Sequence, residues 1–356
     1  MSKPRLRDLG IRIGDYAPGP LNAITDVAGV AVGHCTLIED TPRVVRTGVT
    51  VIMPRPNIFE NHTFAGFHNF NGNGEFTGIH WIQEAGTLMT PIAITSTHQV
   101  GLVRDALVKY EFEATGREAW ALPLVAETYD GWLSDADAHP LTEAHVRAAL
   151  RAVSSGPVAE GAVGGGTGMI CHGFKGGIGT ASRVFETHSG RFTVGALVQA
   201  NYGDRALLRV DGVPVGREIS VEVVDSARKP PKKDGSIIVI LATDAPLLPI
   251  QCRRLAQRAV VGLARAGGTG HNGSGDLFLA FSTGNDLPPD ARQPLAVQML
   301  PNPQMDAVFD AGAEAVEEAI LNALLAAETV VGYKGRTAHA LPHDLLLAAM
   351  TKYGRV

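Results

Sequence analysis

The chain has 356 residues, of which 45% are hydrophobic and 19% charged, so it is globular in composition and can build one large or two ordinary domains. Its formal net charge is −5 and its lysines and arginines form no stripe, which gives no electrostatic reason to bind nucleic acid or an anionic membrane. We find no secretory signal and no apolar run of about 18 residues, so we expect a cytoplasmic protein with a small ligand.

Buried strands and amphipathic helices are both expected along the chain. β-Branched or aromatic runs bounded by turn residues predict strands at 48–53, 91–95, 192–200, 236–242 and 277–281. Helical spacing predicts helices at 100–111, 142–152 with Thr142 as N-cap, 249–266 and 305–329. Glycine clusters such as 176–179 predict tight turns or close backbone approaches between strands. Buried strands flanked by helices indicate a layered α/β fold.

One compositional break interrupts this pattern, at residues 226–234. The segment contains four basic residues and two prolines, which predicts an exposed connection that cannot join a central strand. A cut just after it would leave segments 1–235 and 236–356 that share one core. We therefore predict a single composite domain over residues 1–356.

The junction between Gly235 and Ser236 carries the most chemical information. A polar segment stops there, and an apolar strand begins with a hydroxyl as its first side chain. If this peptide bond is cut, the new α-amine of Ser236, with a reference pKa of roughly 7.7 to 8.0, can take the proton of the neighbouring hydroxyl. Glycine before the bond tolerates a distorted backbone. The junction suggests a self-processing hydrolase, although most Gly-Ser-apolar sequences are only a turn before a strand.

Asn201, Glu127 and Tyr129 are polar residues at the ends of apolar runs. The side-chain amide of Asn201 can donate to a developing oxyanion, or it can simply form a turn. Glu127 and Tyr129 follow the apolar residues 122–126. A carboxylate in that place can bind a substrate ammonium by a charge-assisted hydrogen bond, whereas the alternative is a solvated Glu127 and a packing Tyr129.

Ser274 and Asp276 lie two residues apart in a glycine-flanked turn before a predicted strand. On an extended backbone both side chains project to one side, where they could orient the amine and hydroxyl of Ser236. The alternative is a local Asx or Ser turn. Ser274 is not a nucleophile of the G-x-S-x-G type, because residue 272 is Asn.

The sequence predicts no metal and no cofactor. Cys35, Cys171 and Cys252 are odd in number and form no C-x-x-C pair, and the 12 histidines include no H-E-x-x-H. The glycine run at 164–168 lacks the G-x-G-x-x-G order of a dinucleotide site. We expect this run, and Gly166 in particular, to form a backbone wall of the substrate pocket.

Seven ordered motifs give the chain a resemblance to a known family. They lie at 72–75 (Gly-Asn-Gly-Glu), 127–131 (Glu-Thr-Tyr-Asp-Gly), 164–169, 174–183, 195–201, 235–239 (Gly-Ser-Ile-Ile-Val) and 272–276 (Asn-Gly-Ser-Gly-Asp). They are similar to the DmpA family of L-aminopeptidase D-Ala-esterase/amidases and to the related β-peptidyl aminopeptidases. The match runs from residue 7 to residue 355.

This resemblance implies an αββα sandwich that converges on the N-terminal-nucleophile hydrolases, and a precursor that cleaves itself between Gly235 and Ser236. It also assigns roles to three polar residues: oxyanion donor for Asn201, amine anchor for Glu127 and assistance at the cleavage centre for Tyr129. Family members carry a Ser and an acidic residue at the positions of Ser274 and Asp276, which could relay a proton. Some family members carry Glu in place of Asp276, whose side chain reaches less far. A homo-oligomer, a tetramer of cleaved protomers, is implied as well.

The sequence thus predicts a self-processing serine aminopeptidase that removes N-terminal residues from short peptides, amides or esters. Two alternatives stay open at this point. One is acyl transfer to an amine, as in the ornithine acetyltransferases, and the other is an uncleaved binding or scaffold protein without catalysis. The sequence does not decide between L-, D- and β-amino acids in the substrate.

Overall fold

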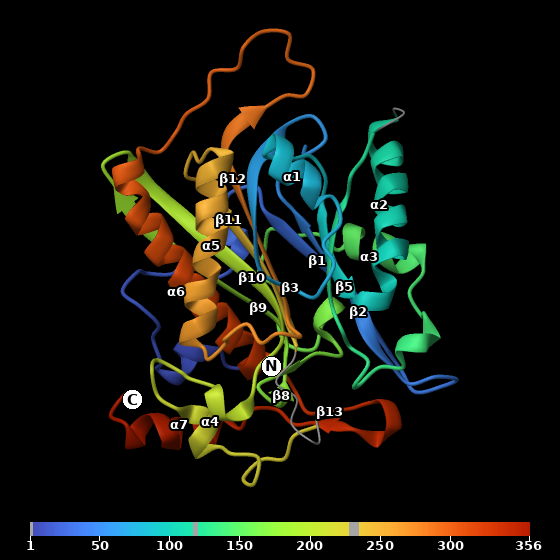
Figure 1. The fold of residues 1–356 in the computed structure, drawn as a ribbon, viewed down its shortest axis with the longest axis vertical. Coiled ribbons are helices and arrows are strands. Elements are labelled where there is room, and N and C mark those ends of the chain that lie inside the picture. The colour runs from blue at the N-terminus through green and yellow to red at the C-terminus, as the bar shows by residue number, and fades with distance from the viewer. Residues whose placement is uncertain (1–2, 117–119, 228–234) are drawn as a thin grey trace.

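The computed structural model describes residues 3–116, 120–227 and 235–356, which form four layers (Figure 1). Two β-sheets face each other at the centre, and helices cover the outer face of each. The larger sheet has the strand order β4-β3-β12-β11-β10-β9, and the smaller has the order β1-β2-β5-β6. The αββα sandwich expected from the sequence is confirmed.

The larger sheet contains the junction at residue 236. Its strands are β3 (His62–Gly72), β4 (Thr87–Leu88), β9 (Gly177–Thr187), β10 (Gly190–Asn201), β11 (Ser236–Thr243) and β12 (Gly275–Leu287). Strands β11 and β12 are parallel and are joined through helix α5 (Pro249–Arg265), while the other neighbours are antiparallel. Helices α5 and α6 (Met305–Ala326) pack on the outer face. The strands β11 and β12 from after residue 235 therefore lie between β3 and β10 from before it.

The smaller sheet and its helices come entirely from the first half of the chain. Its strands are β1 (Ala31–Glu39), β2 (Val45–Met53), β5 (Ile92–Ser96) and β6 (Leu124–Thr128). Helices α2 (Val100–Thr115) and α3 (Glu143–Arg151) cover its outer face. Strands β5 and β6 run parallel, so their carboxyl ends meet at one edge of the sheet.

The remaining elements are short and lie around the sandwich. They are helices α1 (Ile79–Ala85), α4 (Val215–Glu218) and α7 (His343–Lys352), and the strand pairs β7 (Ile170–Cys171) with β8 (Phe174–Lys175) and β13 (Val330–Val331) with β14 (Thr337–Ala338). Single turns of 3-10 helix occur at Leu6–Leu9, Ile24–Asp26, Thr97–Gln99, Ala136–Ala138, Gly164–Gly166, Arg205–Leu207, Asn302–Gln304 and Tyr333–Gly335.

Three apolar cores hold the layers together. The central core lies between the sheets, where Ile238 and Leu279 of the larger sheet pack with Ile52 and Ile92 of the smaller one. A second core lies between the larger sheet and helices α5 and α6, and a third lies between the smaller sheet and helices α2 and α3. Both faces of the strands are thus buried, which explains their continuous apolar runs.

All five predicted strands and all four predicted helices are present, but other strands were missed. Strands β1 and β3 were not predicted. The close backbone approaches expected at glycines 176–179 are present, but Gly177 and Gly179 lie inside strand β9 and not in turns. A Cβ on Gly179 would stand 2.0 Å from the carbonyl oxygen of Ala319, so glycine lets helix α6 approach the strand. Helix α6 ends at Ala326 rather than at residue 329.

The predicted exposed connection lies mostly outside the described residues, which omit 228–234. Its first residue, Ser226, is buried. Within the described residues, no helix is long and apolar enough to cross a membrane, and no group of three or more His, Cys, Asp or Glu side chains could hold a metal ion.

Candidate active site

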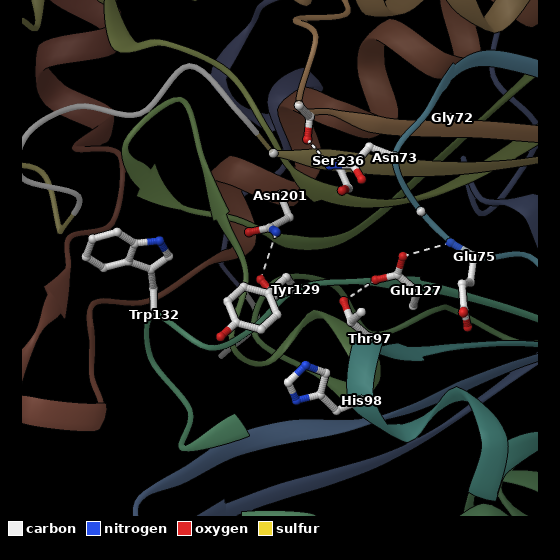
Figure 2. Close-up of a pocket in the computed structure, with 13 residues that line it drawn as sticks. Gly72, Asn73, Glu75, Thr97, His98, Glu127, Tyr129, Trp132, Asn201 and Ser236 are labelled. Atoms are coloured by element: carbon white, nitrogen blue, oxygen red, sulfur yellow. Dashed lines mark hydrogen bonds between the residues drawn. The ribbon is translucent and has the colours of Figure 1, made fainter. Parts of the chain in front are cut away.

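A cavity of about 730 Å³ opens at the edge where ends of the two sheets meet. Figure 2 shows Ser236 and Asn201 of the larger sheet on one side, and on the other Glu127 of β6 with Thr97 and His98, which follow strand β5. The full lining consists of Gly72, Asn73, Gly74, Glu75, Thr97, His98, Glu127, Tyr129, Trp132, Asn201, Gly235, Ser236 and Gly273. Five of the predicted site residues therefore share one cavity: Gly235, Ser236, Asn201, Glu127 and Tyr129.

Ser236 begins strand β11 and is fixed by both neighbouring strands. It pairs with Asn201 on β10 and with Gly275 on β12. The backbone N–H of Gly275 donates to the carbonyl oxygen of Gly235 at 3.1 Å and to Oγ of Ser236 at 3.3 Å. One amide thus contacts both the hydroxyl of Ser236 and the carbonyl of Gly235, the two groups that would react with each other if the chain were cut before Ser236.

Gly235 is required for steric reasons. A Cβ at this position would stand 2.3 Å from the carbonyl oxygen of Asn201 and 2.6 Å from Cα of Tyr202, both of them backbone atoms. Its φ does not lie in the left-handed region. The sequence argument relied on the conformational freedom of glycine, whereas the structure gives a different reason for glycine here, the close approach of β10.

The side-chain amide of Asn201 has a defined orientation. Its Oδ1 accepts from the backbone N–H of Ile170 at 2.9 Å, and its Nδ2 donates to the carbonyl oxygen of Tyr129 at 2.9 Å (Figure 2). Each backbone partner can play only one role, so the oxygen and nitrogen of the amide cannot be exchanged. Asn201 therefore brings a fixed amide dipole to the cavity beside Ser236.

Ser274 and Asp276 form a buried pair next to the nucleophile. Oγ of Ser274 donates to Oδ1 of Asp276 at 2.6 Å. Burial raises the pKa of Asp276 to about 6, against the opposing effect of hydrogen bonds from Ser274 and from the amide of Ile237. Neither residue lines the cavity, because strand alternation puts Asp276 beside Ile237, on the opposite face from Ser236. The expected projection to one side is found, but the carboxylate contacts the backbone next to Ser236 and not its hydroxyl.

Glu127 lies near the carboxyl end of β6 and is only 3% exposed. Its carboxylate accepts from the backbone N–H of Glu75 at 3.0 Å and from Oγ1 of Thr97 (Figure 2). Burial raises the pKa of Glu127, and these two hydrogen bonds oppose that shift. Among the described residues no lysine or arginine forms an ion pair with Glu127. A buried carboxylate with two neutral donors is suited to an ammonium that arrives with the substrate.

Aromatic side chains form the rim of the cavity. Tyr129 is 44% exposed, and its ring meets that of His98 edge-on with 5.7 Å between the centroids. Trp132 lines another part of the rim and carries the guanidinium of Arg336 at 4.3 Å from its ring centroid. The rim can contact the apolar part of a substrate beyond the reacting carbonyl.

The sequence analysis missed Thr97 and His98, and it misplaced Gly166. Thr97 and His98 follow the end of β5, and the parallel pairing of β5 with β6 brings them to Glu127. Polar residues after two apolar strands were the available signal. Gly166 is buried and does not line the cavity; its carbonyl oxygen accepts from Nζ of Lys175 at 3.1 Å.

The four-layer fold, the hydroxyl at the start of a central strand and the buried carboxylate across the cavity are the features expected of a serine hydrolase with the fold of the N-terminal-nucleophile hydrolases. Comparison with known proteins agrees with this class. The chain belongs to peptidase family S58, whose model matches residues 22–338.

Three relatives show how closely the chain follows this family. A β-peptidyl aminopeptidase of Sphingosinicella microcystinivorans is 46% identical over 99% of this chain and 93% of its own. The structure of a β-aminopeptidase of Burkholderia sp. is 55% identical, with a TM-score of 0.93 and 99% of each chain covered. The structure of an L-aminopeptidase D-Ala-esterase/amidase of Ochrobactrum anthropi is 47% identical, with a TM-score of 0.93 and 99% of each chain covered.

The Ochrobactrum protein is described as a prototype of the serine aminopeptidases and as a variant of the Ntn hydrolase fold. Family membership and these relatives make the present chain a serine aminopeptidase. They favour this reading over acyl transfer and over a binding protein without catalysis.

Proposed function

We propose that the chain cuts itself between Gly235 and Ser236 and then uses Ser236 as an N-terminal nucleophile. The observation that carries this proposal is the amide of Gly275, whose nitrogen lies 3.1 Å from the carbonyl oxygen of Gly235 and 3.3 Å from Oγ of Ser236. A donor in this place polarises the carbonyl that the hydroxyl attacks and stays beside the oxygen as charge develops on it.

Self-cleavage would proceed as an acyl shift followed by hydrolysis. Oγ of Ser236 attacks the carbonyl carbon of Gly235, the C–N bond breaks, and the proton of the hydroxyl ends on the new α-amine. Water then hydrolyses the ester, which releases the carboxylate of Gly235 and leaves Ser236 with a free amine and hydroxyl. The absence of a side chain at Gly235 lets its carbonyl lie between β10 and β12.

Catalysis on a substrate would use both sides of the cavity. Glu127 holds the substrate ammonium, Oγ of Ser236 attacks the carbonyl of the first residue, and the α-amine of Ser236 takes the hydroxyl proton. The amide of Asn201 stabilises the oxyanion, and water releases the acyl group. Asp276 and its partner Ser274 position the start of β11 from the other face of the sheet and hold the amine of Ser236 in place.

The proposed substrates are short peptides, amides and esters with a free amino terminus. Relatives are named for β-peptidyl substrates, for L-aminopeptidase action and for D-Ala esters and amides. The cavity of about 730 Å³ accommodates a short substrate whose apolar part contacts Tyr129 and Trp132. The cytoplasmic location and the homo-oligomer stay predictions.

Mass spectrometry and N-terminal sequencing of the purified protein test the proposal. We expect two chains, one of which begins Ser-Ile-Ile-Val, and peptidase activity that appears together with them. Ser236→Ala should stay uncut and lose activity by about 10⁶-fold, as when other serine nucleophiles are removed. A single 37.5 kDa species with full activity would refute the mechanism.

A further inference from the structure

Lys175 lies on a short hairpin behind the cavity. Strands β7 and β8 pair Ile170 with Lys175, and His172 and Gly173 form the turn with φ values of 50° and 72°. Positive φ at both central residues is the geometry of a tight type I′ hairpin, which fixes the side on which Lys175 projects. The side chain points inward and is 0% exposed.

Among the described residues, the hydrogen bonds of the Lys175 ammonium all go to carbonyl groups. Nζ donates to the carbonyl oxygens of Gly166 at 3.1 Å, Met169 at 2.9 Å and Gly176 at 2.7 Å. No Asp or Glu of the described residues lies within ion-pair distance of it. Burial lowers the pKa of Lys175 to about 7, and the nearby Cys171 opposes that shift. The three carbonyl acceptors favour the form with three N–H groups. Burying a cation without a carboxylate partner is energetically costly, so packing alone does not explain a buried lysine at this position.

A single peptide group joins Lys175 to Asn201. Its carbonyl, that of Met169, accepts from Nζ of Lys175 at 2.9 Å, and its N–H, that of Ile170, donates to Oδ1 of Asn201 at 2.9 Å. A cation at the carbonyl end makes the N–H a stronger donor, and an amide whose oxygen accepts a stronger bond becomes a better donor through its own nitrogen. The polarisation therefore runs from the ammonium to the amide of Asn201, the strand neighbour of Ser236.

We propose that Lys175 is a positioning residue for the reaction, which holds and polarises the amide of Asn201 through the Met169–Ile170 peptide group. The inference rests on the proposed function, because it needs Asn201 as the oxyanion donor. It adds a buried cation that acts from outside the cavity and touches neither substrate nor Ser236. Loss of the charge should weaken transition-state stabilisation and leave substrate binding nearly intact.

Arg205, in the 3-10 turn Arg205–Leu207, contacts the same hairpin and offers a matched control. It is also a buried cation held by carbonyl groups: it donates to His172 at 2.8 Å and to Gly173 at 3.0 Å, and it lies over the ring of Phe174 at 3.3 Å. None of its hydrogen bonds reaches the Met169–Ile170 peptide group. If the reaction only needs a rigid hairpin, replacing Lys175 or Arg205 should lower kcat equally. If the charge acts through the Met169–Ile170 peptide group, only the replacement of Lys175 should lower kcat.

The decisive experiment is a double-mutant cycle on the processed enzyme with an aminoacyl p-nitroanilide. We expect Lys175→Met to lower kcat about tenfold with little change in KM, a part of the roughly 10²- to 10³-fold effect of an oxyanion donor. In the Asn201→Ala background the same change should lower kcat less than about twofold, because the amide that Lys175 polarises is then absent. Arg205→Met should lower the melting temperature and change kcat by less than about twofold.

Equal losses from Lys175→Met in both backgrounds, or equal kcat losses from Lys175→Met and Arg205→Met, would overturn the inference. If Lys175→Met does not fold, Lys175→Gln replaces it, since an amide can still donate to two of the three carbonyls without a charge. Lys175→Arg should then recover activity relative to Lys175→Gln, and failure to do so contradicts the role of the charge.

Inhibitor binding distinguishes polarisation of the Asn201 amide from a general loss of structure in the Lys175→Met variant. An amino aldehyde, which forms a tetrahedral adduct with Ser236, should bind Lys175→Met about tenfold more weakly than wild type, while the matching amino alcohol should bind both equally. Parallel weakening of both compounds would speak for a merely structural role. Two other results would contradict the proposed function itself: a wild-type chain that is not cut before Ser236, or an Asn201→Ala variant that keeps the kcat of wild type.

Discussion

The two sides of the cavity are held in different ways. On the side of the larger sheet, Ser236, Gly235 and Gly275 are fixed by backbone pairing between three strands, with no space for a Cβ at Gly235. On the side of the smaller sheet, Glu127 and Thr97 lie at strand ends and are held by side-chain hydrogen bonds. In the proposed mechanism, the reacting bond lies on the side held by backbone pairing, and the amine is bound on the side that depends on individual side chains.

This difference predicts how mutations divide between kinetic parameters. Changes on the larger sheet should affect self-cleavage and kcat, because the transition state depends on a geometry held within a fraction of an ångström. Changes on the smaller sheet should affect KM and the choice of substrate. The predictions below test this division, beginning with the largest effect.

Gly235→Ala should slow self-cleavage at least 100-fold, roughly the cost of a displacement of about 1 Å at a reacting group. The new Cβ would stand 2.3 Å from a backbone oxygen of β10, so the scissile carbonyl must move. A time course of chain separation on a denaturing gel measures the rate. Gly101→Ala is the control: a Cβ on this helical glycine would have no atom within 4 Å, and the change should stabilise α2 by about 1 kcal/mol without slowing cleavage. Cleavage of Gly235→Ala at the wild-type rate would contradict the prediction.

Asn201→Ala should lower kcat about 10²- to 10³-fold with a small change in KM, as expected for loss of an oxyanion donor. Steady-state kinetics on a p-nitroanilide measure both parameters. Asn322 is a matched control, because it is a fully buried asparagine in α6 that accepts from the backbone N–H of Leu6 at 3.1 Å and donates to the carbonyl of Thr180 at 3.0 Å. Asn322→Ala should lower the melting temperature and keep kcat. Similar kcat losses in both variants would place Asn201 among purely structural residues.

Glu127→Gln should raise KM and lower kcat/KM about 10- to 100-fold, the value of one hydrogen bond to a charged group. The same variant should be more stable than wild type at neutral pH. Burial raises the pKa of Glu127, so the folded state loses stability as the pH rises through that raised pKa and the carboxylate ionises. Kinetics and thermal unfolding at pH 7 measure the two effects.

A substrate that lacks the amino group provides the control for Glu127. It should be cleaved poorly by wild type and at the same rate by Glu127→Gln, because neither enzyme has an ammonium to bind. A deficit of equal size on both substrates would show that Glu127 acts through the structure and not through the amine.

Asp276 should produce a pH dependence with opposite signs for activity and stability. Its pKa is raised by burial from 3.8 to about 6, so the folded state binds more protons than the unfolded state between about pH 4 and pH 6, and stability is lost as the pH rises through that window. Asp276→Asn should therefore gain stability at pH 7, on the order of 2 to 3 kcal/mol, and none at pH 4. Denaturant unfolding at the two pH values measures this difference.

Activity should follow the ionised form of Asp276. We expect kcat/KM of wild type to fall below about pH 8 as the α-amine of Ser236 gains a proton, and more steeply below about pH 6 as Asp276 does. Asp276→Asn should be poorly active at every pH and should lack only the limb near pH 6. The limb should persist in Glu127→Gln, which separates the two carboxyl groups. A limb near pH 6 that survives in Asp276→Asn would assign it to another group.

Most of the side held by backbone pairing could be predicted from the sequence, and only part of the side that depends on individual side chains. Ser236 and Asn201 stand at the ends of apolar runs, so the chain itself marks where a strand begins or ends beside them. Thr97 and His98 are separated from Glu127 by about 30 positions, and only the parallel pairing of β5 and β6 brings them together. Pairing between distant strands is not written in local patterns, which is why these two residues were missed.

Glycine-rich strands were missed for a related reason. Gly66 of β3 and Gly179 of β9 have low strand propensity, yet a Cβ on them would stand 2.1 Å from the backbone nitrogen of Arg253 in α5 and 2.0 Å from the carbonyl oxygen of Ala319 in α6. The helices approach these strands so closely that only glycine fits. A rule based on propensity assigns such residues to turns, because the partner that requires them is far away in the sequence.

The smallest effect concerns Tyr129, and it tests what the exposed rim contributes. A Cβ on Gly131 would stand 2.2 Å from the hydroxyl oxygen of Tyr129, so Gly131→Ala should push the ring away from His98. We expect a two- to fivefold rise in KM from Gly131→Ala, about the size of a partly exposed aromatic contact. Tyr129→Phe removes the hydroxyl and keeps the ring. If Tyr129 assists cleavage through its hydroxyl, Tyr129→Phe should slow self-cleavage. If the rim only packs against substrate, Gly131→Ala should raise KM more than Tyr129→Phe does. Comparing the two variants on one substrate decides between these roles.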